Sequence, residues 1–161
     1  MAEYRFLTVW RIDAPIDRVF ATILDAPEWP RWWPTVRKVE VIDLGDEDGI
    51  GTVCRYTFRG WLPYSLVFDV RVTRIEQPTV LEGIATGELE GTGLWVLEPT
   101  GDTTIVRYEW NVRTTQWWMN LAAPIARLFF TWNHDYVMER GRRGLQRYLL
   151  VQHVDRLHEQ R

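Results

Sequence analysis

The sequence predicts an α+β fold, in which helices cover one face of a curved, seven-stranded antiparallel sheet. Three observations carry this prediction. Residues 4–12 alternate between apolar and polar side chains, as a half-buried strand does. Further strand-like segments then follow one another between residues 36 and 113, separated by short turns. The last part of the chain has the periodicity of one long C-terminal helix, which begins near Pro124.

Two short helices are predicted between the first and second strands. Asp13 is a suitable N-cap, Pro15 suits a first helical turn, and apolar residues recur at helical spacing after it. Pro27 ends this helix. The segment 28–33 follows as a short aromatic helix or turn, which Pro34 closes.

The later strands are recognised by alternation and by the turn residues between them. Leu66, Phe68 and Val70 alternate with Asp69 and Arg71, so the carboxylate and the guanidinium should face solvent. Consecutive strands joined by short turns form an antiparallel meander. The predicted strands occupy residues 36–42, 51–59, 64–76, 79–86, 91–98 and 103–113.

The second half of the long helix has an apolar stripe and a charged face. His134, Met138 and Leu145 share the stripe, which is predicted to face the sheet. Glu139 and Arg143 lie on the opposite face at the spacing of a helical ion pair.

Two glycines, Gly141 and Gly144, lie on the apolar stripe, although each weakens a helix interior by up to about 1 kcal/mol. Two interpretations are open. The glycines make an ordinary packing contact, or they allow the helix to approach a bulky sheet side chain or a ligand.

The first half of the helical region, residues 117–132, is apolar almost all round. The outer face of this region would be apolar, and something must cover it. It consists of Leu121, Ile125, Leu128, Phe129 and Trp132. The candidates are the aromatic segment 29–33, a second copy of the chain in a homodimer, and a membrane surface.

The composition predicts one globular domain over residues 1–161, with 46% hydrophobic and 25% charged residues. A net charge of −3 argues against nucleic-acid binding. One cysteine, Cys54, excludes an internal disulfide, and neither a secretory signal nor a transmembrane segment is recognisable, so we expect a cytoplasmic protein. Three histidines without partners at ligand spacing predict no metal site, and no motif predicts a cofactor.

Several motifs resemble those of the START/polyketide-cyclase (SRPBCC) superfamily. They are the opening strand with residues 12–20, the aromatic segment 27–34, and residues 133–138 and 141–145. The resemblance covers essentially the whole chain and implies the helix-grip fold, a sheet curled around a long C-terminal helix. This superfamily hosts ligand carriers, cyclases and hydroxylase domains, so the resemblance leaves the function open. No catalytic signature of the superfamily is present in the sequence.

Ten tryptophans in 161 residues indicate an aromatic-lined cavity, because a small core cannot absorb so many indoles without strain. The alternative is that the aromatic side chains fill this space themselves. His134 and Arg127 would be polar contacts for a ligand, or they are hydrogen-bonded in the core, or Arg127 reaches the solvent. Leu94 and Val96 would serve equally as the inward pair in place of Trp95. The predicted ligand site lies between sheet and helix and comprises Tyr56, Phe58, Phe68, Trp95, Tyr108, Trp110, Arg127, Phe130, His134 and Met138.

Three functions are compatible with these features. The first is binding of a hydrophobic or aromatic small molecule, lipid- or polyketide-like, in the cavity. The second, which the resemblance allows, is a polyketide cyclase/dehydrase or aromatase-type enzyme in which His134 moves protons. The third is a partner-binding domain that uses the apolar 117–132 surface. Binding leads because no catalytic constellation is visible.

Overall fold

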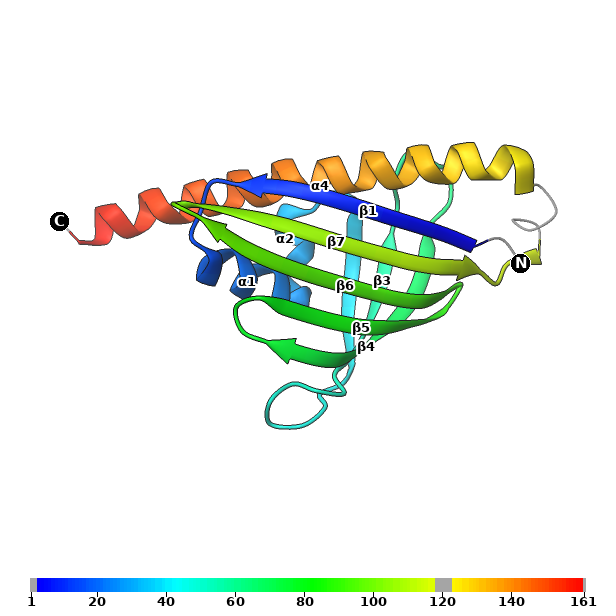
Figure 1. Ribbon diagram of the computed structural model, residues 1–161, viewed down its shortest axis with the longest axis horizontal. Helices are drawn as coiled ribbons and strands as arrows, with labels where there is room; N and C mark the ends of the chain where they lie inside the picture. Colours follow the sequence, from blue (N-terminus) through cyan, green and yellow to red (C-terminus); the bar gives the residue numbers. More distant parts are fainter. Residues whose placement is uncertain (1–2, 118–122, 161) are drawn as a thin grey trace.

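The computed structural model describes residues 3–117 and 123–160, and its elements follow the predicted order (Figure 1). Strand boundaries differ from the predicted ones by at most two residues. The elements are β1 (Glu3–Ile12), α1 (Ile16–Leu24), the short 3-10 helix η1 (Ala26–Glu28), α2 (Trp29–Trp32), β2 (Val36–Asp43), β3 (Val53–Phe58), β4 (Leu66–Glu76), β5 (Val80–Gly87), β6 (Leu89–Thr100), β7 (Thr103–Thr114) and α4 (Ala123–Glu159).

All seven strands form one antiparallel sheet in the order β1-β7-β6-β5-β4-β3-β2. Strands β2 to β7 pair with their neighbours along the chain, and β1 pairs with β7. The sheet curls, and α4 runs along its open side beside β1 (Figure 1). Helices α1 and α2 close one end, where the C-terminal part of α4 projects beyond the sheet. This helix-grip arrangement confirms the predicted fold.

Helix α1 begins later than predicted. Its N-cap is Pro15, whose backbone is extended at φ −61° and ψ 145°, so the helix starts at Ile16. The prediction that Asp13 is the N-cap is therefore wrong. The Asp13 backbone N–H donates instead to Oε1 of Gln146 at 2.8 Å, and this bond ties the start of α1 to α4.

Helix α4 packs closely against the aromatic segment at its two glycines. A Cβ on Gly141 would lie 2.5 Å from Cε2 of Trp33, and one on Gly144 would overlap the carbonyl oxygen of Trp32. The Trp33 indole N–H also donates to the carbonyl of Val137 at 2.8 Å. The close approach that these glycines allow is thus to the segment 29–33, and not to a sheet side chain or a ligand as one interpretation held.

The tryptophans divide between the core and the surface. Trp61, Trp117 and Trp132 are exposed, with 58%, 74% and 66% of their surface accessible. Trp118 and Leu121 lie outside the described residues. The buried tryptophans are Trp10, Trp29, Trp32, Trp33, Trp95 and Trp110.

The outer face of the first half of α4 stays open to solvent. Ile125, Leu128, Phe129 and Trp132 are all exposed there. The segment 29–33 packs into the core instead. This segment therefore does not cover the apolar face of α4, which was one of the three possibilities that the sequence left open. Among the described helices, none is long and apolar enough to cross a membrane.

Candidate ligand-binding cavity

A cavity of about 260 Å³ lies between the concave face of the sheet and α4. Its walls come from all three parts of the fold, because the sheet contributes alternate side chains, α4 contributes one stripe, and η1 and α2 close one end. Most of the lining side chains are aromatic or aliphatic. The few polar ones include Tyr4, Asn133 and His134.

Glycines in the central strands leave room for large side chains from the neighbouring strands. A Cβ on Gly83 of β5 would lie 2.6 Å from Cγ1 of Val70. A Cβ on Gly93 of β6 would lie 3.0 Å from the ring of Trp110 and 3.1 Å from the hydroxyl of Tyr108. The side chains of β4 and β7 therefore lie across these strands and form the wall there.

Stacked aromatic rings form the remaining wall of the sheet. The rings of Trp95 and Tyr108 face each other across β6 and β7 with centroids 3.9 Å apart and an interplanar angle of 21°. On β3 and β4, Phe68 stacks on Phe58 at 5.6 Å and on Tyr56 at 5.9 Å. Such close, oriented contacts hold each ring in place and give the cavity a defined shape.

Tyr56 and Tyr108 place two phenol groups in this aromatic wall. Burial raises the pKa of Tyr108 well above its ordinary value, and the nearby Tyr56 raises it further. Burial also raises the pKa of Tyr56, with a smaller contribution from Cys54. Both hydroxyls therefore stay protonated at neutral pH. Burial likewise raises the pKa of the Cys54 thiol, which is not activated as a nucleophile.

His134 lies on α4 at the other side of the cavity. Its ring stacks on Phe6 of β1 with centroids 3.9 Å apart and an interplanar angle of 8°. Both ring nitrogens are buried, and neither has a hydrogen-bond partner among the described residues. Burial lowers the pKa of His134 to about 4, although the carboxylate of Asp135, 3.7 Å from Nδ1, raises it in part. The imidazole is therefore neutral at pH 7.

Tyr4 adds a second polar group near His134. Its ring packs against Phe6 and Phe130, with centroids 5.8 Å and 5.2 Å away. Its hydroxyl is buried and has no hydrogen bond to residues 3–117 or 123–160. Burial raises the pKa of Tyr4, and the positive charge of Arg127 opposes this effect.

Asn133 joins the cavity wall to the loop between β3 and β4. Its side chain lines the cavity, and Oδ1 accepts the backbone N–H of Trp61 at 2.9 Å and that of Leu62 at 3.4 Å. Gly60 lies directly under this side chain, because a Cβ there would collide with Asn133. The loop is thus attached to α4 through a buried polar residue, as buried amides require.

Arg127 is not among the residues that line the cavity. Its side chain is exposed, and one guanidinium nitrogen donates to the backbone carbonyl of Glu3 at 3.1 Å. A guanidinium gains more from water and a carbonyl partner than from an apolar cavity, so it turns outwards. The other predicted site residues all line the cavity: Tyr56, Phe58, Phe68, Trp95, Tyr108, Trp110, Phe130, His134 and Met138.

Sequence reasoning missed several lining residues. Tyr4 and Phe6 lie on the same face of the alternating first strand, and this alternation was a sufficient signal to place them at the site. The aromatic segment was noted as a motif, but nothing in its local sequence shows that it folds back under α4. The missed residues include Tyr4, Phe6, Trp29, Trp33 and Asn133.

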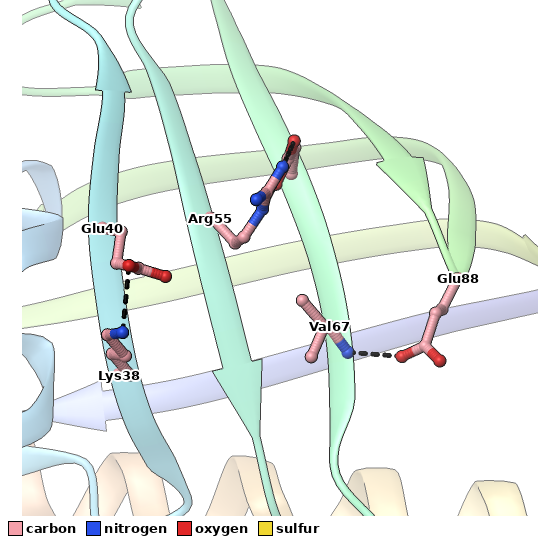
Figure 2. A network of polar contacts seen from close by, with 6 residues as sticks. Lys38, Glu40, Arg55, Val67 and Glu88 are labelled. Atoms are coloured by element: carbon pink, nitrogen blue, oxygen red, sulfur yellow. Dashed lines mark hydrogen bonds and ion pairs between the residues drawn. The ribbon is translucent and has the colours of Figure 1, made fainter.

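Ion pairs and other polar contacts lie on the opposite, convex face of the sheet (Figure 2). Exposed apolar side chains such as Leu7 and Ile84 lie on this face as well. Arg55 holds Asp69 with two hydrogen bonds of 2.8 and 2.9 Å, as a guanidinium does with a carboxylate. The same view shows Lys38 beside Glu40 at 2.9 Å, and the Glu88 carboxylate accepting the backbone N–H of Val67 at 2.6 Å. This face is suited to contact with water, so the apolar site belongs to the concave side. In the described part of the chain, no three His, Cys, Asp or Glu side chains gather closely enough to hold a metal ion.

The sequence model of one protein family matches residues 5–149, and the family is described as "Polyketide cyclase / dehydrase and lipid transport". The chain belongs to this family. Membership in the polyketide cyclase/dehydrase and lipid transport family agrees with the resemblance found in the sequence motifs. A comparison with curated protein sequences finds no match.

Several solved structures have the same START-like fold as this chain. TTHA0849 from Thermus thermophilus has a TM-score of 0.72 and 18% identity, over 94% of this chain and 99% of that one. A START superfamily protein from Mycobacterium smegmatis has a TM-score of 0.73 and 12% identity, over 89% and 98%. The Zhui aromatase/cyclase from Streptomyces sp. R1128 has a TM-score of 0.69 and 13% identity, over 90% and 92%. Identities this low show the fold alone.

Proposed function

We propose that the chain binds a hydrophobic or aromatic small molecule, lipid- or polyketide-like, in the cavity between the sheet and α4. The observation that carries the proposal is a cavity of about 260 Å³ with aromatic and aliphatic walls and few polar groups. Sites of this composition bind small molecules by burying them, while a few polar groups fix their orientation. The family description, which includes lipid transport, supports the same function.

Native mass spectrometry of freshly purified protein tests this proposal. We expect an adduct of small-molecule mass that disappears on denaturation. Val70→Phe places a ring in the cavity and should remove the adduct, because Val70 lines the wall. The matched control is Ile84→Phe on the adjacent strand, whose side chain is exposed on the convex face, and it should keep the adduct. An adduct that survives Val70→Phe would show that the ligand is held elsewhere and that the proposal is wrong.

Catalysis in the same cavity is the second candidate, and His134 is the observation that favours it. A neutral imidazole with two unpaired ring nitrogens can accept or donate a proton beside a bound substrate. The family description, which names a polyketide cyclase and a dehydrase, supports this candidate. Turnover of an aromatic or polyketide-like substrate that His134→Gln abolishes, with binding retained, would favour the enzyme over the binding protein.

Self-association is proposed for the exposed apolar face of α4. This face, which we call the tryptophan patch, consists of Trp61, Ile125, Leu128, Phe129 and Trp132. Trp61 stacks parallel to Phe129 at 6.4 Å and edge-on to Trp132 at 5.6 Å, so loop and helix form one surface. Since each large aromatic side chain can bury about 150–250 Å², the patch exposes on the order of 600 Å². That area approaches the roughly 800 Å² that each partner contributes to a standard interface.

A further inference from the structure

The described residues that line the cavity include polar groups but no cation. This combination limits the charge of the ligand that the cavity can hold. Among the described residues that line it, there is no lysine or arginine. The imidazole of His134 is neutral, and the phenols of Tyr56 and Tyr108 keep their protons. Glu82, half-buried in the lining, supplies a carboxylate. The electrostatic environment is therefore neutral to negative.

The two phenols of the sheet wall belong to one connected cluster of aromatic rings. Tyr56 packs against Trp29 at 5.3 Å, and Trp29 in turn packs against Trp95, on which Tyr108 stacks. The Tyr108 hydroxyl lies over Gly93, where a side chain would displace it. Both side chains line the cavity. A phenol is both a donor and an acceptor, so the pair is available to a ligand.

The charge of the ligand decides whether the cavity can replace the interactions that the ligand loses with water. A carbonyl or hydroxyl oxygen needs only the hydrogen bonds that two phenols offer. A carboxylate buried in the same place would lose its hydration without gaining a cation, and Glu82 would repel it. An apolar molecule with no oxygen would leave both phenol groups without a partner.

We propose that the cavity selects uncharged ligands and that their oxygen atom is held by the hydroxyls of Tyr56 and Tyr108. The ligand class is therefore an aromatic or hydrophobic ketone, phenol or alcohol, and free carboxylic acids are rejected. This inference rests on the proposed binding function. The inference specifies the chemical class of the ligand and the residues that bind its oxygen atom.

Equilibrium dialysis with three probes of similar shape tests the inference. The probes are 2-acetylnaphthalene, 2-naphthoate and naphthalene, compared at pH 7.5, where the acid is ionised. We expect 2-acetylnaphthalene to bind at least about tenfold more tightly than 2-naphthoate. Tyr56→Phe and Tyr108→Phe should lower the affinity for 2-acetylnaphthalene towards that for naphthalene. Tyr136→Phe, at an exposed tyrosine of α4, is the control and should change nothing.

The outcomes separate this inference from the function on which it rests. If 2-naphthoate binds as tightly as 2-acetylnaphthalene, the selection by charge is wrong, although the cavity is a binding site. If the ketone is preferred but both tyrosine variants bind it normally, the assignment to Tyr56 and Tyr108 is wrong. If none of the three probes binds, the proposed binding function fails, and this inference fails with it.

Discussion

At the scale of single residues, His134 combines burial with a titratable ring. The imidazole is stacked on Phe6, and burial holds its pKa at about 4, against 6.5 for an ordinary histidine. The unfolded chain therefore binds a proton at a higher pH than the folded protein does. Stability from this residue is complete above about pH 6.5 and is lost as the pH falls towards 4.

This residue predicts a fall in stability under mild acid. Between pH 7 and pH 4.5, the free energy of unfolding should fall by about 2 to 3 kcal/mol, since each unit of pKa shift corresponds to about 1.4 kcal/mol. His134→Phe keeps the stacked ring but removes the titration, so its stability should be flat over this range. His153→Asn, at an exposed position, is the control. Urea denaturation at several pH values measures the effect, and an equal slope in wild type and His134→Phe would contradict it.

Glu139 does not interfere with this measurement. Hydrogen bonds from Arg142, and then from Arg143, lower the pKa of Glu139 to about 2. Its contribution is therefore present above its ordinary pKa of 4.5 and is lost only as the pH falls towards 2. The two pH ranges hardly overlap, so the change above pH 4.5 reports on the histidine.

At the scale of elements, the contact between α4 and the aromatic segment replaces the usual packing of side chains by a contact with backbone. Gly144 lies against the carbonyl of Trp32, and Gly141 lies against the indole of Trp33. Because a backbone carbonyl cannot rotate away as a side chain can, the helix position at Gly144 tolerates no Cβ.

Gly144→Ala is therefore expected to destabilise the protein. In an ordinary helix the change would stabilise by about 1 kcal/mol. Here the added methyl group must displace α4 from α2, at a net loss of about 1 to 3 kcal/mol in the free energy of unfolding. Urea denaturation followed by circular dichroism measures this loss. Thr131→Ala, at an exposed site of the same helix, should stay within about 0.5 kcal/mol of wild type. A variant Gly144→Ala more stable than wild type would show that the contact is loose.

At the scale of the whole molecule, paired charges and the tryptophan patch lie on different parts of the surface. Paired charges such as Arg55 with Asp69 lie on the convex face of the sheet, whereas the tryptophan patch lies on α4 and the β3–β4 loop. Asn133 holds that loop against α4, so the patch has a fixed shape. A fixed apolar surface of this size favours a partner of matching shape.

The proposed partner, a second copy, predicts a concentration-dependent mass. Sedimentation velocity of the wild type should show a dimer at tens of micromolar. Leu128→Glu places a charge in the patch and should shift the protein to monomer, because burying an unpaired carboxylate is costly. Arg140→Glu, an equally exposed change outside the patch, should leave the dimer intact. A wild-type protein that stays monomeric throughout the range would overturn the proposal.

The sequence was informative where periodicity alone determines orientation. Tyr56 and Phe58, like Tyr108 and Trp110, sit two residues apart on one strand, so burial of one implies burial of the other. Trp33 could not be placed, because its position depends on a contact with Val137, 104 positions away. Arg127 was misplaced for a related reason. A helical projection gives the face of a residue but not the point along the helix at which the cavity ends.

The missing methyl groups at Gly141 and Gly144 determine more than a packing contact. If α4 slipped by one turn, about 5.4 Å, Leu145 and Tyr148 would come to the places that now admit only hydrogen atoms. The helix therefore has a single permitted register along the sheet. That register is what brings Phe130, His134 and Met138, and not their neighbours, to the cavity. Two glycines that do not line the cavity thus determine which side chains of α4 do.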